Sequence, residues 1–145
     1  MTGQRVALAN DHAGLGLKNA LKRELESSGY EVLDLGANST ESVDYPDFGR
    51  ALAEAIAAGR AERGVAICGS GIGISIAANR NPKVRAALCH DVSTARLARM
   101  HNDANVLALG ARTIGEAVAL DCLKAFLTTD FEGGRHARRV AKLSG

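Results

Sequence analysis

Short apolar runs alternate with longer amphipathic segments along the chain. Five of the runs are nearly continuous and bounded by Gly, Asn or Asp, which is typical of buried strands. They are Val6–Ala9, Val32–Leu35, Val65–Cys68, Val84–Cys89 and Val106–Leu109. Because helical segments separate the runs, the pattern predicts an α/β fold in which helices cover both faces of a parallel sheet.

The segments between and after the runs show helical periodicity. We expect helices over about 17–29, from about 46, after Gly73, over 91–100, from 113 to about 127 and over 135–143. Gly29 is a suitable C-cap residue, Asp91 a suitable N-cap, and Thr113–Glu116 reads as a capping box. No linker, repeat or low-complexity stretch interrupts the pattern, so we expect one domain over 1–145.

Composition narrows the function classes. The 145 residues carry a formal net charge of only +2, with 3% aromatic residues and no Trp. This disfavours binding to nucleic acid or to a membrane surface. The three Cys form no C-x-x-C pair, which disfavours disulfides and a structural zinc site. No segment has the length of a signal or membrane span, so we expect a cytoplasmic protein.

In parallel α/β folds, ligands bind where the strands end, and candidate chemistry follows several of the expected strands. The first is followed by Asp11-His12. The pair could bind an anion or move a proton, or Asp11 could simply cap a helix beside an exposed His12. The segment alone favours neither interpretation.

The third strand ends at Cys68 and is followed by Gly69, Gly71 and Gly73. Glycines let the backbone approach a ligand, and a thiol at a helix start should have a lowered pKa, so Cys68 is a candidate base or nucleophile. The alternative is an inert buried Cys. A dinucleotide fingerprint would need Gly at position 74, and a tyrosine-phosphatase loop would need Arg there. Ile74 fits neither.

Further polar residues follow the fourth helix and the fifth strand. His101-Asn102 could be an oriented acid–base pair or a surface histidine stabilised by the helix dipole, and Arg112 follows the last strand.

In the tail, Arg135 and Arg139 lie one helical turn apart and suit a phosphate, although a solvated basic face is the commoner explanation. No His/Cys/Asp/Glu set has metal-ligand spacing, so we expect no metal.

As an ordered set these motifs resemble the type B ribose-5-phosphate isomerases and the related galactose-6-phosphate isomerase subunits. The segments that carry the resemblance are Asp11–Gly14, Asp44–Pro46, Cys68–Asn79, His101–Asp103, Gly110–Arg112 and Glu132–His136. The resemblance implies a five-stranded Rossmann-like αβα sandwich. It also implies an enzyme of the pentose phosphate pathway. It also implies a homodimer, or a dimer of dimers, with the last helix at the interface and the active site shared between subunits.

The resemblance also implies roles for individual residues. Cys68 would be the carbon base, because Ser75 stands where other members carry a Glu, and His101 would open the sugar ring. The catalytic set would also include Asp11, as the next candidate base, and Ser70. Substrate and phosphate would contact His12, Tyr45, Gly69, Gly71, Gly73, Asn102, Arg112, Arg135 and Arg139. Asn10 departs from the family pattern, where a small residue is frequent.

The residues also support an isomerase reaction when the family resemblance is set aside. Moving a carbonyl from C1 to C2 needs one base, which Cys68 could supply, and amides from Gly69 to Gly73 could stabilise the enediolate. No hydride leaves the substrate, so no cofactor is expected.

Ribose 5-phosphate is the leading substrate; allose 6-phosphate, galactose 6-phosphate and a tetrulose 4-phosphate stay open. A non-catalytic sugar-phosphate-binding domain would not need Cys68 with His101, and a response-regulator receiver needs an Asp at position 68.

Overall fold

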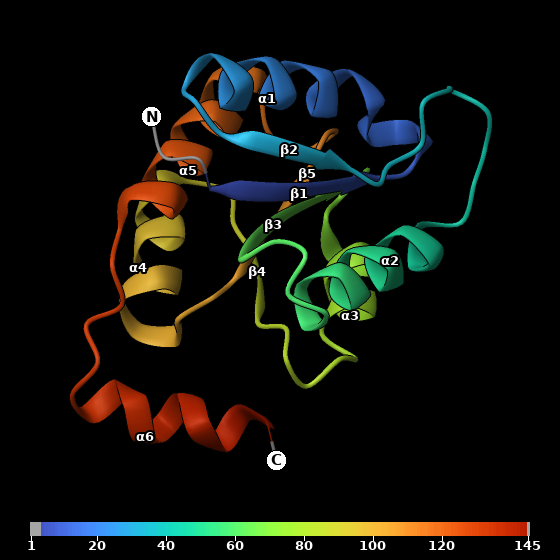
Figure 1. Ribbon diagram of the computed structural model, residues 1–145. Helices are drawn as coiled ribbons and strands as arrows, with labels where there is room; N and C mark the ends of the chain where they lie inside the picture. Colours follow the sequence, from blue (N-terminus) through green and yellow to red (C-terminus); the bar gives the residue numbers. More distant parts are fainter. Residues whose placement is uncertain (1–3, 145) are drawn as a thin grey trace.

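A five-stranded, all-parallel sheet forms the centre of the protein in the computed structural model, which describes residues 4–144 (Figure 1). The strands are β1 (Arg5–Asn10), β2 (Glu31–Asp34), β3 (Arg63–Cys68), β4 (Ala86–Leu88) and β5 (Val106–Gly110). Their order across the sheet is β2-β1-β3-β5-β4. All five strands lie at the predicted runs, and the predicted α/β class is confirmed.

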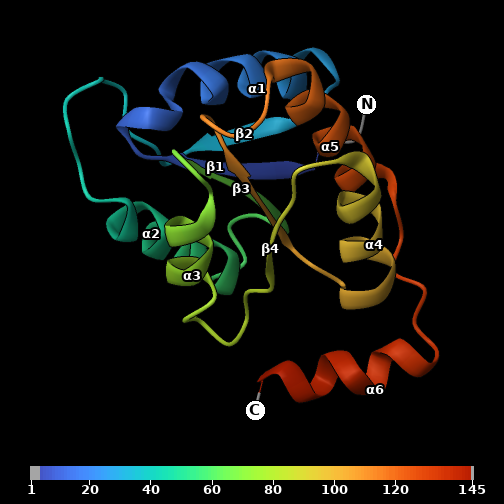
Figure 2. The same cartoon turned by 180° about the vertical axis from the view of Figure 1, so that it is seen from behind.

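Helices cover both faces of the sheet. They are α1 (Leu15–Ser27), α2 (Tyr45–Ala57), α3 (Ile72–Ala78), α4 (Val92–Asn102), α5 (Glu116–Thr128) and α6 (Arg135–Ala141). Helices α1, α4 and α5 lie on one face, and α2 and α3 lie on the other (Figures 1 and 2). Alternate residues of each strand feed the two cores: Val6 and Leu8 face α1 and α5, whereas Ala7 and Ala9 face α2. This is the period-2 pattern of a sheet buried on both sides.

One predicted helix cap is present and one is wrong. The Asp91 side chain accepts a hydrogen bond from the backbone N–H of Thr94 at 2.7 Å and caps α4 as expected. The capping box at 113–116 does not form, because Thr113 Oγ1 donates to the Gly110 carbonyl at 3.1 Å within a tight turn after β5. Helix α5 therefore begins at Glu116, with Gly115 as an N-cap that has no side-chain hydrogen bond.

The order of the strands reverses next to β1, which places a ligand cleft. From β1 the chain moves outward to β2 and then returns across β1 to β3. At such a switch point the loops after the two central strands diverge and leave a crevice at their carboxyl ends. The crevice lies between the segments after Asn10 and after Cys68, where Asp11 and the glycine-rich loop had been predicted to act.

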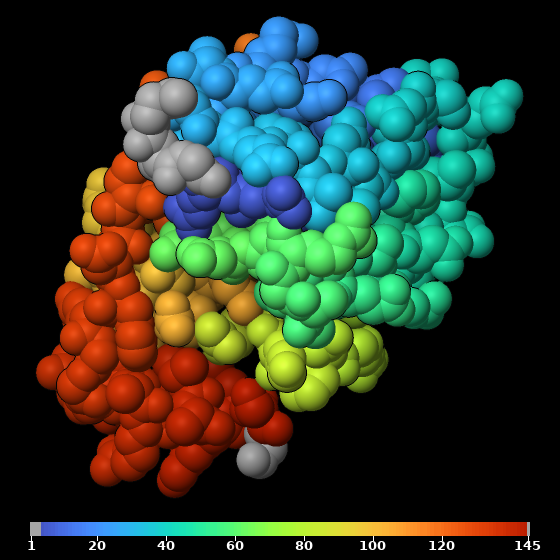
Figure 3. Space-filling view, viewed as in Figure 1, coloured from blue at the N-terminus to red at the C-terminus, as the bar shows by residue number. Residues whose placement is uncertain are grey.

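Helix α6 extends away from the sheet, on the side remote from the loop that leads into α2 (Figure 1). It contacts the end of α4 and forms a protruding corner at the lower left of the molecule (Figure 3). Ser144 Oγ, just beyond it, donates to the Pro82 carbonyl at 3.1 Å. Within residues 4–144, no helix has both the length and the apolar character needed to cross a membrane.

Candidate active site

A cleft of about 550 Å³ lies at the switch point. Its walls come from the loops after β1, β3 and β5 and from the start of α2 and α3. The residues are Asp11, Tyr45, Cys68, Gly69, Ser70, Ile72, Gly73, Ile76, Arg112 and Thr113. The structure thus brings together seven of the predicted site residues, among them Asp11, Cys68 and Ser70. Gly71, also predicted, lies in the same loop.

The sulfur of Cys68 sits at the base of this cleft and is held by the glycine-rich loop. The backbone N–H of Gly71 donates to Cys68 Sγ at 3.2 Å. Gly71 has a φ of +78°, and a Cβ there would lie 2.6 Å from Leu88 Cδ1, so glycine is required. The next amide, that of Ile72, donates to Ser70 Oγ at 3.2 Å. These two N–H groups therefore hold the thiol and the Ser70 hydroxyl in place. The amides from Gly69 to Gly73 were expected to stabilise an enediolate, and those of Gly71 and Ile72 already have these partners.

Asp11 both caps a helical turn and faces the cleft, so the two interpretations of this segment combine. Its Oδ1 accepts hydrogen bonds from the amides of Ala13 at 3.0 Å and Gly14 at 3.3 Å. Next to it, His12 Nδ1 accepts from the backbone N–H of Val43 at 3.1 Å. With Nδ1 accepting, the proton of a neutral imidazole lies on Nε2. His12 is therefore set to donate through Nε2.

Two large side chains pack against glycines of the loop. The Tyr45 ring lies against Gly73, where a Cβ would overlap Tyr45 Cε1. Arg112 lies over Gly69, with its Nη1 atom 3.2 Å from the position of a Cβ. A guanidinium and a phenol therefore line the cleft together with Cys68. Gly73 is needed to admit the Tyr45 ring, whereas a Cβ at Gly69 would only require Arg112 to shift slightly.

Asn10, which departs from the family pattern, lies behind the cleft and does not line it. Its amide nitrogen donates to the carbonyls of Asp11 at 2.8 Å and Ala37 at 3.0 Å, and the residue is fully buried. Asn10 thereby ties the Asp11 turn to the loop after β2. It shapes the pocket from behind through the position of Asp11.

A buried ion pair that sequence reasoning missed anchors the same loop. Lys18 is fully buried and donates to Asp34 Oδ2 at 2.8 Å and to Asn38 Oδ1 at 2.7 Å. Burial alone would raise the pKa of Asp34, but hydrogen bonds from Lys18 and the Gly36 amide outweigh it and lower that pKa. Lys18 occupies a polar position next to the Leu17–Leu21 stripe, and nothing in the sequence marked it as buried.

A second group of predicted residues lies around the ends of α4 and α6. His101, Asn102 and Arg139 line one small cavity together with His136, Val140 and Leu143. The rings of His101 and His136 stack, with centroids 4.4 Å apart and planes 15° apart. Removal from water lowers the pKa of His136, and the neighbouring His101 and Arg135 act in the same direction. Arg135, predicted to bind phosphate, is exposed and lines neither cavity.

These two groups lie at opposite ends of the parallel strands, so one chain does not join Cys68 to His101. After His101 the chain enters β5 at Val106, which pairs with Gly64 of β3. Cys68 lies four residues further along β3, and at about 3.3 Å per residue this corresponds to roughly 13 Å along the strand. In Figure 1, α4 and α6 accordingly lie on the side away from the loop that leads into α2.

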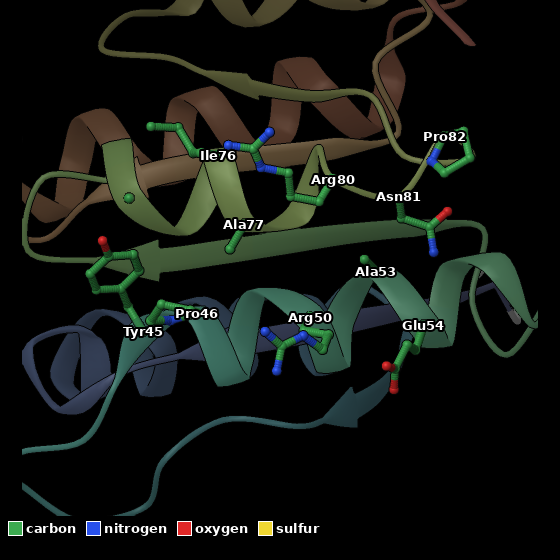
Figure 4. Close-up of a pocket in the computed structure, with 11 residues that line it drawn as sticks. Tyr45, Pro46, Arg50, Ala53, Glu54, Ile76, Ala77, Arg80, Asn81 and Pro82 are labelled. Carbon is green, nitrogen blue, oxygen red and sulfur yellow. The ribbon is translucent and has the colours of Figure 1, made fainter. Parts of the chain in front are cut away.

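A second groove, of similar volume, lies beside the Cys68 cleft, between α2 and α3 (Figure 4). It has a volume of about 570 Å³, with Tyr45 and Ile76 at one end and Asn81 and Pro82 at the other. The cationic side chains among its lining residues are Arg50 and Arg80, and those lining residues include no Cys or His. We therefore assign the chemistry to the neighbouring Cys68 cleft, which shares Tyr45, Gly73 and Ile76 with the groove.

Comparisons with known proteins identify the family. The Ribose/Galactose Isomerase family model matches residues 6–143. The solved structure of Clostridium thermocellum ribose-5-phosphate isomerase B superposes with a TM-score of 0.96 at 50% identity, covering 97% of this chain and 95% of that one.

The curated relatives that are 42% identical to this chain include two whose names give a substrate. One is ribose-5-phosphate isomerase B of Escherichia coli, with 97% of this chain and 95% of the relative covered. The other is D-erythrulose-4-phosphate isomerase of Pectobacterium atrosepticum, with 95% and 91% covered. Fold and sequence agree, and the chain belongs to the ribose/galactose isomerase family.

Proposed function

We propose that this chain interconverts an aldose phosphate and its ketose, with ribose 5-phosphate and ribulose 5-phosphate as the leading pair. The observation that carries the proposal is the Cys68 sulfur, which lies in the switch-point cleft with the Gly71 N–H directed at it. An N–H donor is a favourable partner for a negatively charged sulfur. The cleft therefore offers a base where the reacting carbons of a sugar would lie.

The reaction balances without an external oxidant or reductant. For the aldose, Cys68 takes the proton from C2, and the electrons of that bond form the C1–C2 double bond of an enediolate. The same thiol returns the proton to C1, while the proton of the C2 hydroxyl moves to the oxygen on C1. C1 is reduced and C2 is oxidised. Ser70 and Asp11 line the cleft with Cys68 and would assist the proton transfer between the two oxygens.

Ring opening uses the residues at the ends of α4 and α6, and phosphate binding uses residues from both groups. His101, which is partly exposed at the end of α4, opens the cyclic sugar, with Asn102 beside it. Arg112 in the cleft, the Nε2–H of His12 and Arg139 bind the phosphate, with Arg135 in the tail contributing charge. Phosphate contacts far from the reacting carbons supply binding energy that positions C1 and C2 against Cys68.

We further propose that a second copy of the chain completes each site. Within one chain the Cys68 group lies at the carboxyl ends of the strands and the His101–Arg139 group lies beyond their amino ends. The rim of the Cys68 cleft carries exposed apolar side chains, Ile72 at 52% and Ile76 at 53%, on one face of α3. Such a rim is typical of a surface covered by a partner. Helix α6 extends from its own domain and carries Arg139, as a helix that reaches into a neighbour would.

The test is an isomerisation assay with four-, five- and six-carbon sugar phosphates, using unphosphorylated ribose as the control. We expect the highest kcat/KM with ribose 5-phosphate and very poor turnover of ribose. A higher kcat/KM with a tetrulose 4-phosphate would transfer the assignment to that substrate, in line with the relative named D-erythrulose-4-phosphate isomerase. Binding without turnover of any sugar phosphate would contradict the proposal and favour a non-catalytic domain.

A further inference from the structure

Two histidines and one glutamate meet at the junction of α4 and α6. Glu132 Oε1 lies 3.4 Å from His136 Nε2 and 3.9 Å from His101 Nε2. One ligand atom from each residue can be chosen so that all three lie within 4.8 Å of one another. This set was not predicted, because His101 is more than thirty positions from the other two residues and no local spacing connects it to them.

One nitrogen of the set is buried without a partner. His136 is 7% exposed, and its Nε2 atom, shielded from water, has no hydrogen-bond partner among the described residues. It faces the Glu132 carboxylate at 3.4 Å, but the two are not aligned as a hydrogen bond. A buried polar atom without a partner is rare and calls for an explanation, and a cation between His136 and Glu132 would provide one.

We propose that His101, Glu132 and His136 bind a divalent transition-metal ion of the zinc class, and that a bound ion inhibits the isomerase by taking the ring nitrogen of His101. Two imidazoles and one carboxylate suit zinc and its neighbours, whereas Mg²⁺ and Ca²⁺ prefer oxygen ligands. Three protein ligands leave a further position open towards the cavity that Arg139 lines. The inhibitory half of this inference rests on the proposed role of His101.

The distances fit a metal after one side-chain movement. With bonds of about 2.1 Å and tetrahedral angles, neighbouring ligand atoms lie about 3.4 Å apart. The His136–Glu132 pair is already at 3.4 Å, and His101 must approach from 3.9 Å. Imidazole binds a metal in its ring plane, which two stacked, nearly parallel rings do not allow together. His101, whose side chain is 40% exposed, is the ring that can rotate. Rotation removes it from the position of an acid–base group.

The binding test uses the full chain, freed of metal by a chelator, with Zn²⁺ in competition with a chromophoric chelator. We expect one ion per chain, with affinity about tenfold or more lower in Glu132→Gln and in His136→Gln. The controls are His90→Gln, which removes an exposed histidine outside the set, and Cys68→Ser, which removes the cleft thiol; both should bind Zn²⁺ as the parent does. Glu132→Gln is nearly isosteric at an exposed position, so it decides the question even if His136→Gln does not fold.

Co²⁺ in place of Zn²⁺ provides a readout that is independent of activity. Its visible absorption should appear in the parent and weaken in Glu132→Gln. Equal affinity of the parent and both ligand variants, or no binding by the parent, would overturn the site. This result would stand whether or not the chain turns over any sugar phosphate.

Inhibition is measured on the same proteins. Zn²⁺ should suppress turnover of a cyclic sugar phosphate by the parent, a chelator should restore it, and Glu132→Gln should need about tenfold more Zn²⁺ for the same inhibition. Binding at these residues with turnover unchanged would overturn the inhibitory half and count against His101 as the ring opener. Absence of activity in every protein would contradict the proposed function alone.

Discussion

The backbone N–H of Gly71 donates a hydrogen bond to the sulfur of Cys68, 3.2 Å away, at the carboxyl end of β3. Only a residue that tolerates a φ of +78° can hold the amide in this position. The glycine-rich loop therefore orients the thiol that we propose as the base. The first two predictions concern that thiol.

Cys68→Ala should lower kcat by about 10²–10⁴ with little change in KM, because the base is lost and the phosphate contacts remain. The melting temperature should shift only modestly, since the sulfur lies at a cleft. Cys122→Ala is the matched control: Cys122 is fully buried in the core against α4, so this variant should lose stability and keep kcat. A folded Cys68→Ala protein with near-parental kcat would exclude Cys68 as the base.

Iodoacetamide should alkylate Cys68 faster than the other two thiols. Burial raises the pKa of Cys89, and burial raises that of Cys122 to about 11. At pH 7 only about one Cys122 in ten thousand would be a thiolate, and the thiolate is the reactive form. Mass spectrometry of partly alkylated protein, with and without a sugar phosphate, measures the order. Faster labelling of Cys89 or Cys122, or no protection of Cys68 by the ligand, would contradict the account.

Arg139→Ala should raise KM strongly and also lower kcat, because the phosphate would no longer position the reacting carbons. Arg138→Ala removes the same charge from the same helix, but Arg138 does not line the His101 cavity. This control should keep near-parental kinetics. Steady-state assays of the two variants separate a phosphate site from a solvated basic face, since similar kinetics in both would indicate only the latter.

Asp34→Asn should destabilise the protein by about 3 kcal/mol, because it leaves the fully buried ammonium of Lys18 without its carboxylate. Asp47→Asn breaks an exposed pair with Arg50 and should cost about 0–1 kcal/mol. Urea unfolding at neutral pH measures both. A cost for Asp34→Asn no larger than that of the control would show that the pair does not anchor the loop.

The same ion pair has a defined pH dependence. Because folding lowers the pKa of Asp34, its ionised carboxylate adds stability above the unfolded value of about 3.8. That contribution is lost as the pH falls through the lower folded pKa. The stability difference between the parent and Asp34→Asn should therefore narrow below about pH 4, and a constant difference down to pH 2 would contradict this assignment.

Local signals predicted the fold, and they also indicated several of the residues that the structure brings together in the Cys68 cleft. Apolar runs located every strand, and Cys68 with its glycines could be assigned to a strand end because strand direction and loop follow from neighbouring residues. The error at Thr113 arose because a tertiary turn competed for its hydroxyl. The buried Lys18 and the Glu132–His136 contact to His101 depend on the packing of distant elements. No local spacing encodes them.

The candidate site is divided between the two ends of the parallel strands, with Cys68 at one end and His101 at the other. The central claim is that Cys68 of one chain works with His101 of a second chain. Cys68→Ala and His101→Asn each remove one required group, so each variant alone should turn over a cyclic sugar phosphate at a small fraction of the parental rate.

The most direct measurement co-expresses these two variants with different tags and purifies the dimers that carry both. Each mixed dimer would contain one site with both defects and one intact site, made of Cys68 from one chain and His101 from the other. The account predicts that the mixed dimers recover about half of the parental kcat per dimer. Activity no higher than that of the two variants alone would show that each site lies within one chain and would contradict the claim.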